Sequence, residues 1–297
     1  MENNPIILVF LPISLGIIMI GLGLHLTLAD FGRVVKQPKA VVIALLVQMV
    51  LLPPICFLIA KLFKLPPELG LGLLLLAASP GGITANLFSH LARGDVALNI
   101  TLTAINSVLV LFTLPFWIFV GMGFFLAAEN NIPPPTGKVL EVAALVIVPV
   151  LLGMCLRYFK PALAQSAEKP VRILSVLILV VLTAFAIASE WNLLMAYAPV
   201  LGLACLTFNL LSLTCGYLSA RAVNLAKPQA TAIAFEIGVH NATIAIFIAL
   251  NVLKMPATAI APAIYSLIMY VTAAMLAYWL LRQQKPAYRA ANSAKIG

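Results

Sequence analysis

The stretch that decides the fold is Phe235-Glu236-Ile237-Gly238-Val239-His240-Asn241, which sets a carboxylate, an imidazole and an amide inside one long apolar segment. Of the nine acidic residues, only Glu236 lies within such a segment. The others lie at the ends of hydrophobic runs or between them: Glu2, Asp30, Glu68, Asp95, Glu129, Glu141, Glu168 and Glu190. A carboxylate inside a bilayer costs roughly 2.5 to 3.5 kcal/mol on insertion scales, so it is retained mainly where it binds something. We expect Glu236 to bind a cation; the alternative is a protonated or hydrogen-bonded structural glutamate.

The composition predicts an all-α polytopic membrane protein. Of 297 residues, 63% are hydrophobic and 9% are charged, against about 25% charged in an ordinary soluble domain. The four cysteines fall in apolar runs without paired spacing, which indicates buried small hydrophobes rather than disulfides or metal ligands. The net charge of +9 is spread singly or in pairs through connecting loops, a pattern typical of membrane orientation and not of nucleic-acid binding. No cofactor is indicated.

Nine membrane spans are predicted, taking about 20 apolar residues as one crossing. They cover approximately residues 6–28, 38–63, 68–91, 95–126, 138–158, 171–190, 195–222, 229–252 and 257–282. With the amino terminus outside, 14 of the 18 Lys and Arg residues fall in inner loops and 4 in outer loops. That asymmetry predicts an outside amino terminus and a cytoplasmic carboxyl terminus in a multi-pass protein of the cell inner membrane.

Two of the predicted spans are interrupted at corresponding places. Span 68–91 contains Ser79-Pro80-Gly81-Gly82, where proline removes a backbone donor and paired glycines tolerate unwound dihedral angles. Span 229–252 contains Gly238 and Asn241, and the offset from Asn86 to Asn241 is 155 residues. We expect one transmembrane transporter domain over 1–297, with inverted repeat halves at about 6–126 and 171–282, a linking helix at about 138–158 and a cytoplasmic tail at 283–297. Inverted repeats with paired broken helices form binding sites where the unwound segments meet.

Several oxygen donors are expected near that meeting point. Unwound backbone at membrane depth must line a cavity or be buried in protein. Its carbonyls, the Glu236 carboxylate and the amides of Asn86 and Asn241 suit a small hard cation such as sodium. Asn99, Thr103 and Asn106 share one helix face by their spacing, although interhelical hydrogen bonding explains such a stripe equally well. Gln48 and Asn209 are further polar residues in mid-span.

The sequence at this point resembles the bile acid:sodium symporter family. Three patterns carry the resemblance, which covers essentially the whole chain: residues 16–24, residues 80–86 together with 91–98, and residues 236–241. The resemblance implies a core of six spans and a panel of three, formed by the spans at 6–28, 138–158 and 171–190. It also implies a substrate cavity between the core and the panel.

The resemblance further implies two sodium sites. The first would use Ala85, Asn86, Asn99, Thr103 and Glu236. The second would use Gln48, Glu236, the backbone of Ile237 and Val239, and the side chain of His240. This chain departs from the family pattern at Ala85, where the family has serine, and at His240, where the family has glutamine. Histidine is a poorer ligand for a hard cation and is the side chain most readily switched near neutral pH.

The function expected from these features is sodium-coupled symport of an organic anion, bile-acid-like or a small carboxylate, by alternating access. Thr84, Asn241, Ser266 and Tyr270 are the expected substrate contacts, each of which packing could also explain. The alternatives are a proton-coupled organic anion transporter that uses His240, and a channel or sensor on the same fold. An enzyme is not expected, because one buried acid forms no acid–base couple. The oligomeric state stays open.

Overall fold

The computed structural model describes residues 16–17, 20–21, 23–24, 36–126 and 136–293. Within these ranges the protein is helical apart from one isolated β-bridge. The elements are α3 (Pro38–Leu46), η2 (Val47–Leu51), α4 (Leu52–Leu62), α5 (Pro67–Ala77), α6 (Ile83–Leu91), α7 (Val96–Phe125), α9 (Thr136–Phe159), α10 (Pro161–Ser189), α11 (Trp191–Ala222), α12 (Lys227–Gly238), α13 (Ala242–Phe247), η3 (Ile248–Val252), η4 (Pro256–Ala259) and α14 (Ile260–Ser293). The α3–η2–α4 run forms one continuous helix with a π turn at its centre.

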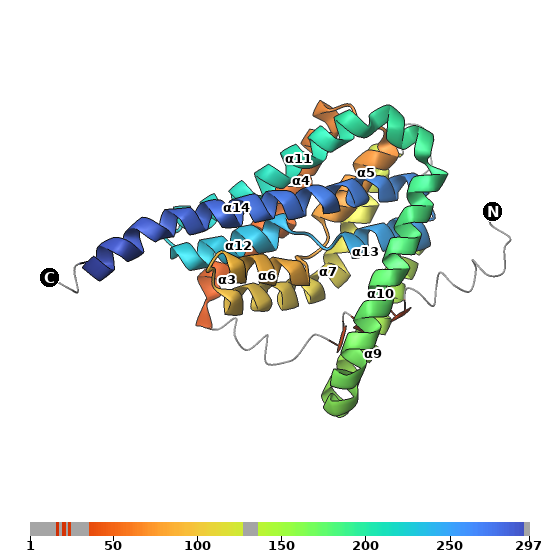
Figure 1. The fold of residues 1–297 in the computed structure, drawn as a ribbon. Coiled ribbons are helices and arrows are strands. Elements are labelled where there is room, and N and C mark those ends of the chain that lie inside the picture. Colours follow the sequence, from red (N-terminus) through yellow and green to blue (C-terminus); the bar gives the residue numbers. More distant parts are fainter. Residues whose placement is uncertain (1–15, 18–19, 22, 25–35, 127–135, 294–297) are drawn as a thin grey trace.

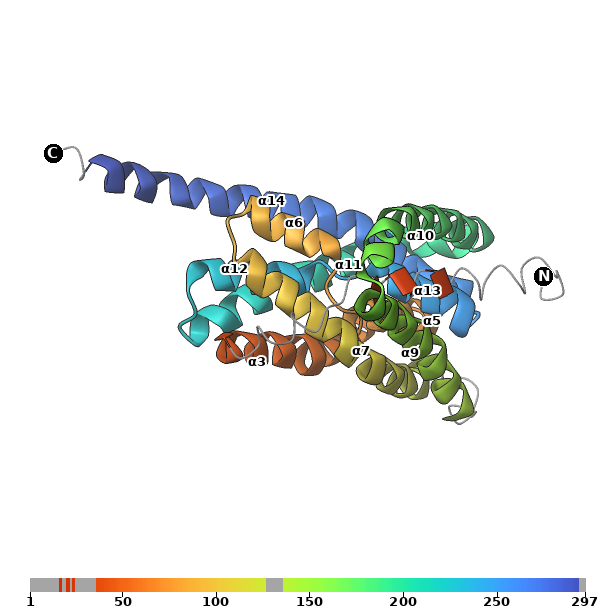
Figure 2. The ribbon, with the colours of Figure 1, turned by 90° about the horizontal axis from the view of Figure 1, so that it is seen from below.

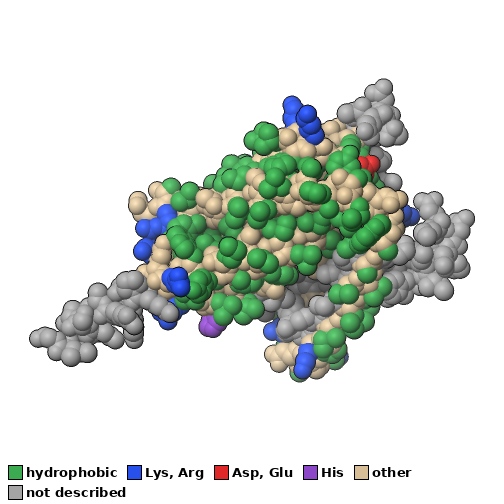
Figure 3. All heavy atoms as spheres, turned by 45° about the horizontal axis from the view of Figure 1, so that its top comes forward, with side chains coloured by type: hydrophobic (Ala, Val, Ile, Leu, Met, Phe, Trp, Pro, Cys, Tyr) green, Lys and Arg blue, Asp and Glu red, His purple; other side chains and the backbone are tan. Residues whose placement is uncertain are grey.

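Four helices among the described residues are long and apolar enough to cross a membrane: 38–62, 96–125, 191–222 and 256–283. Shorter apolar helices lie at 67–77, 148–159 and 242–252. Hydrophobic side chains cover the surface between the two ends of the molecule, and Lys and Arg gather toward the ends (Figure 3). These features are those of a polytopic membrane protein.

The helices fall on eight of the nine predicted spans, and the first span lies largely outside the described residues. Two helices extend beyond their predicted spans. The helix expected from 171 begins at Pro161 and carries Pro170 inside it. The segment expected as a tail from 283 continues as helix to Ser293. Both extensions continue in polar sequence, which hydropathy does not distinguish from a loop.

The two halves of the chain repeat one another in local geometry. After α4, Lys64 has a φ of 50° and Leu65 N–H bonds Ala60 O; after α11, Asn224 has a φ of 61° and Leu225 N–H bonds Ala220 O. Each helix therefore ends in the same left-handed cap, built without glycine. These two caps lie 160 residues apart in the sequence.

The broken helices pack side by side in opposite order. Each interrupted span places one half-helix on either side of its break, so that α12 packs beside α6 and α13 packs beside α5 (Figure 1). Helices α9 and α10 contact each other and lie to one side of this bundle (Figures 1 and 2). Gly23 packs against Gly153 of α9 so closely that a Cβ on either residue would overlap the other chain segment. The first span therefore rests on α9 at this point.

Candidate functional site

The two helix breaks cross and bond to each other through their backbones. Gly82 N–H donates to Val239 O at 3.0 Å, and Asn241 N–H donates to Pro80 O at 2.8 Å. Gly81 and His240 thereby form an antiparallel bridge. Backbone groups freed by a break need partners where no water is available. Each break supplies the donor and the acceptor that the other lacks.

Glu236 lies in the last turn of α12, directly before this crossing, and is fully buried. Thr103 Oγ1 donates to Glu236 Oε2 at 2.6 Å, and Asn106 Nδ2 donates to Glu236 Oε1 at 2.9 Å. Two neutral donors therefore hold the carboxylate from α7. No Lys, Arg or His ion pair to Glu236 is found among the described residues, so its charge has no protein counter-ion there.

Gly81 leaves the space that the carboxylate occupies. A Cβ built on Gly81 would overlap the Glu236 carboxylate. The chain is unwound here as the sequence predicted, and no described glycine has a positive φ. The missing side chain, and not the backbone angle, is what the site requires of Gly81.

Three side-chain amide oxygens on α6 and α7 are buried and have no hydrogen-bond partner. Asn99 Nδ2 donates to Ala232 O at 2.8 Å, one turn before Glu236 on α12, while Asn99 Oδ1 has no hydrogen-bond partner. The side-chain oxygens of Asn86 and Asn106 are likewise buried and without partners. A buried acceptor left unpaired in a native structure calls for an explanation, such as an ion. Carboxylate, hydroxyl and amide oxygens are the donor set of hard cations.

A second polar group lies on the other side of the crossing, between Gln48 and His240. Gln48 Nε2 donates to Ser79 O at 2.9 Å and to Ala77 O at 3.2 Å, and lies 3.4 Å from His240 Nδ1. His240 Nδ1 is also 3.4 Å from Ser79 O, and the ring stacks on Phe208 at 5.8 Å. Both Gln48 Oε1 and His240 Nε2 are buried and without partners. Gln48 and Asn106 share a small cavity of about 10 Å³ beside the break, about the volume that one water needs.

The structure brings several of the predicted cation ligands together, and it places others at positions that differ from those expected. Thr103 bonds Glu236 directly, and Asn99 bonds Ala232 O, one turn before Glu236 on α12. Ala85 and Asn86, expected at the break itself, lie inside α6, whereas the break covers residues 78–82. Val239 O already accepts from Gly82, and Ile237 belongs to the last turn of α12. Asn106 was missed as a site residue, although its place on the Asn99 stripe pointed to it.

The four predicted substrate contacts lie in different environments. Asn241 Oδ1 accepts from Ile244 N–H at 3.4 Å and caps α13. Ser266 Oγ donates to Ala263 O of its own helix at 2.7 Å. Tyr270 is 40% exposed and stacks on Phe88 of α6 at 6.4 Å. Thr84, one turn before Phe88, is half-buried at the start of α6.

The bridge pairs residues of the two breaks at a different offset from the one the sequence suggested. A two-fold axis through an antiparallel bridge exchanges the two bridged residues, so Gly81 and His240 are counterparts, 159 residues apart. The same offset relates Ser79 to Gly238, and their carbonyls accept from Gln48 and Asn209 respectively. By this bridge, Asn86, which lies 155 residues before Asn241, is one helical turn away from the residue that pairs with Asn241. The counterpart of Asn241 is Gly82, and each is the N-cap of its half-helix.

The chain is similar in sequence to several known proteins. Residues 12–197 match the Sodium Bile acid symporter family. The chain is 28% identical over 279 residues to a Bacillus subtilis protein described as an uncharacterized sodium-dependent transporter, YocS, covering 93% of this chain and 84% of that one. It is 27% identical over 265 residues to a rice protein described as a probable sodium/metabolite cotransporter, BASS1, chloroplastic, covering 89% of this chain and 64% of the rice protein. The human P3 protein is 27% identical over 245 residues, covering 82% and 51%.

Proposed function

Because the chain belongs to the sodium bile acid symporter family, a family of transporters and not of enzymes, we propose that it imports an organic anion together with sodium. The observation that carries this proposal is the buried Glu236 carboxylate, held by Thr103 and Asn106 beside amide oxygens that have no partner. Two of the similar proteins are described as sodium-dependent or sodium-coupled. The donor set of the site suits that ion.

The first sodium position is assigned to the space between α6, α7 and α12. Its ligands are the Glu236 carboxylate, the Thr103 hydroxyl, and the side-chain oxygens of Asn86 and Asn99. Thr103 keeps this role because a hydroxyl can donate to Glu236 while its lone pairs face a cation. Ala85 contributes at most its backbone, since its methyl group holds no donor atom.

The fold supports transport by alternating access with an inverted repeat of nine spans. An odd number of crossings between equivalent elements reverses the second copy across the membrane, and the antiparallel bridge at Gly81 and His240 is what a two-fold axis in the membrane plane would produce. The core is assigned to α3 to α7 and α11 to α14. The panel is assigned to the first span, α9 and α10. The first span contacts α9 where Gly23 meets Gly153, and α9 contacts α10. The amino terminus is placed outside and the carboxyl terminus in the cytoplasm, in the cell inner membrane.

The anion is assigned to backbone donors near the crossing. No Lys or Arg occurs in residues 65–92 or 228–253, which contain both breaks and their half-helices. An anion there must rely on N–H groups, hydroxyls and the bound cation itself. Gly82 begins α6 without a side-chain cap, and Thr84, Ser266 and Tyr270 supply the nearby hydroxyls. A small carboxylate or a bile-acid-like anion fits this chemistry.

Proton coupling through His240 is a second candidate function, favoured by one observation. His240 Nε2 is buried without a partner although its ring is stacked and fixed. An imidazole in that state could accept a proton in place of a second sodium. The two candidates differ in which gradient drives uptake.

Proteoliposome uptake separates these functions. Labelled small carboxylates and bile salts are offered under an inward sodium gradient, under an inward proton gradient, and under neither. The proposal expects accumulation above equilibrium that requires sodium. Accumulation under the proton gradient alone would favour the His240 alternative, and equilibration without accumulation would indicate a channel.

A further inference from the structure

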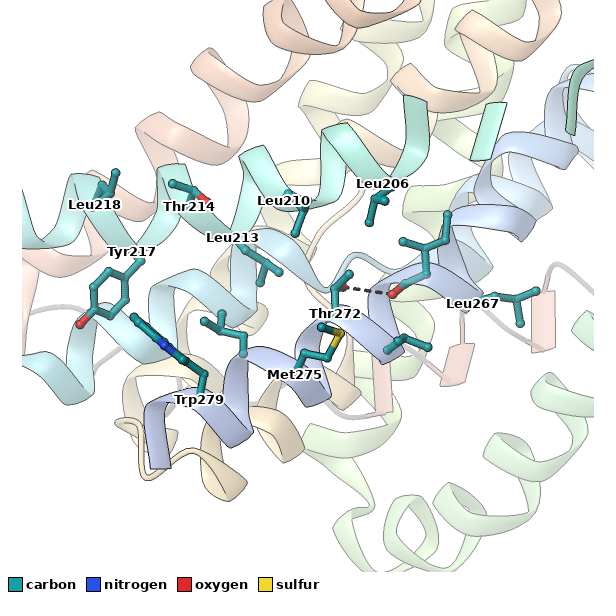
Figure 4. Close-up of a pocket in the computed structure, with 13 residues that line it drawn as sticks. Leu206, Leu210, Leu213, Thr214, Tyr217, Leu218, Leu267, Thr272, Met275 and Trp279 are labelled. Atoms are coloured by element: carbon teal, nitrogen blue, oxygen red, sulfur yellow. Dashed lines mark hydrogen bonds between the residues drawn. The ribbon is translucent and has the colours of Figure 1, made fainter. Parts of the chain in front are cut away.

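A large cavity lies away from the crossing, in a groove between α11 and α14. Its volume is about 1050 Å³, and its wall is apolar except for Thr214, Thr272 and the polar tips of Tyr217 and Trp279. Figure 4 shows the groove running from Leu206 and Leu267 at one end to Tyr217 and Trp279 at the other. None of the residues assigned above to the cation or to the anion lines it.

The length of the groove matches one leaflet of a bilayer. It follows α11 from Leu206 to Leu218 and α14 from Leu267 to Trp279, which at 1.5 Å per residue is about 18 Å on each helix. Half of the hydrocarbon core is about 15 Å. Large side chains on the rim remain open to the surroundings, with Leu218 58%, Leu267 71% and Met275 66% exposed. An acyl chain can therefore enter from the side.

One end of the groove carries the groups that recognise a lipid headgroup. Tyr217 and Trp279 line this end of the groove, and aromatic side chains of this kind are enriched at membrane interfaces. Beyond them, one turn further along each helix, are Arg221 and Arg282, both exposed. The Arg282 guanidinium lies 4.8 Å from the centre of the Tyr278 ring, and Arg221 donates to Leu225 O through Nη1, which leaves its other N–H donors available.

The charged residues of α11 and α14 at this end are all basic. Lys227 and Lys285 follow in the sequence, and Glu236 is the only acidic residue between Trp191 and the carboxyl terminus. Basic side chains beside a cleft between membrane helices at the cytoplasmic surface are a pattern of anionic lipid binding.

We propose that the groove between α11 and α14 binds an anionic phospholipid of the cytoplasmic leaflet. Its acyl chain lies along the leucines of both helices, and its phosphate meets Arg282 and Arg221. Both helices belong to the proposed core. The lipid therefore lies against the core, and not against α9 or α10.

Tryptophan quenching tests this site directly. The chain has three tryptophans, so the double substitution W117F/W191F leaves Trp279, in the groove wall, as the sole reporter. The protein is reconstituted in phosphatidylcholine with increasing fractions of brominated phosphatidylglycerol or of brominated phosphatidylcholine. We expect the anionic lipid to reach half-quenching at a mole fraction about fivefold lower, the effect of about one basic residue at an anionic surface.

The variant Arg282→Gln should remove most of that preference, and Lys39→Gln, an exposed basic residue at the start of α3, should leave it unchanged. Equal quenching by both lipids would overturn the proposal, as would an equal loss of preference in both variants. If neither lipid quenched Trp279, the result would show that protein, such as a second copy, covers the groove. That result would also overturn the proposal. Because both variants lie on the surface, unfolding does not confuse the result.

Discussion

At the scale of single residues, the site depends on a carboxylate fitted against a glycine. Gly81 lies in one break and Glu236 at the end of α12, and the carboxylate occupies the volume where any other residue at 81 would carry its Cβ. Thr103 and Asn106 fix the two carboxylate oxygens from a third helix. The geometry of the cation site therefore depends on how closely the two breaks approach.

Gly81→Ala should separate these partners. The added methyl group must displace either the Glu236 carboxylate or the crossing, and overpacking of this kind typically costs about 1 to 3 kcal/mol. We expect a lower free energy of unfolding together with weakened sodium-dependent stabilisation. Gly82→Ala is the matched control, because the nearest atom to its methyl group would be the Thr84 hydroxyl at 3.3 Å. Equal behaviour of the two variants would contradict the close fit at Gly81.

His240→Gln should change how sodium binding depends on pH. If neutral His240 belongs to the cation site, its protonation places a positive charge beside the ion, so sodium affinity of the wild type should fall as pH falls through the imidazole titration. The variant should retain affinity over the same pH range. Sodium titrations of both proteins at several pH values make the comparison, and identical profiles would leave His240 a structural residue.

The residues of this site were predictable where their polarity differs from that of the surrounding sequence. Glu236 stands out as an acid in an apolar segment, and Asn99, Thr103 and Asn106 follow a helical spacing. The sequence could not show that Asn106 and Thr103 both bond the carboxylate, or that Gly81 makes room for it, because these contacts join residues more than 100 positions apart.

At the scale of the elements, Asn86 and Asn241 have different tasks. Asn241 caps α13, whereas Asn86 lies inside α6 with its side-chain oxygen unpaired. A side chain that caps a helix stabilises the fold, and one that leaves an oxygen free contributes little to it. The two asparagines are therefore not equivalent, although both lie close to a break.

Asn241→Ala should lower the free energy of unfolding by about 0.5 to 2 kcal/mol, and Asn241→Asp should restore most of it. Asn86→Ala should leave unfolding without sodium nearly unchanged and reduce the additional stabilisation by sodium. Denaturation of each variant with and without sodium gives both quantities. Loss of stability in Asn86→Ala without sodium would mean that its oxygen has a structural partner.

The breaks themselves were predictable from Pro80, Gly81, Gly82 and Gly238, since these residues interrupt apolar helices. Their alignment was not. An offset counted between two asparagines gave 155 residues, and only the backbone bridge showed that the counterparts are 159 apart. Side-chain identity does not reveal register when the two repeats have diverged.

At the scale of the whole molecule, the proposed orientation places Lys61 outside and Lys39 inside. Both residues are exposed at opposite ends of the α3–η2–α4 helix. In a background with the four cysteines changed to alanine, Lys61→Cys should react with a membrane-impermeant maleimide on intact bacterial cells. Lys39→Cys should react only after the membrane is opened. The reverse pattern would invert the assignment of every loop.

Sodium binding by wild type and Glu236→Gln tests the central claim most directly, because it needs no knowledge of the transported anion. Thermal unfolding of the purified proteins is followed as sodium chloride replaces choline chloride at constant ionic strength. A ligand that binds only the folded state stabilises it, by about 2.7 kcal/mol at a hundredfold excess over its Kd. We predict that the wild-type unfolding temperature rises with sodium and that the folded Glu236→Gln variant shows no such rise. An equal rise in both proteins would contradict the assignment of Glu236 as the cation ligand.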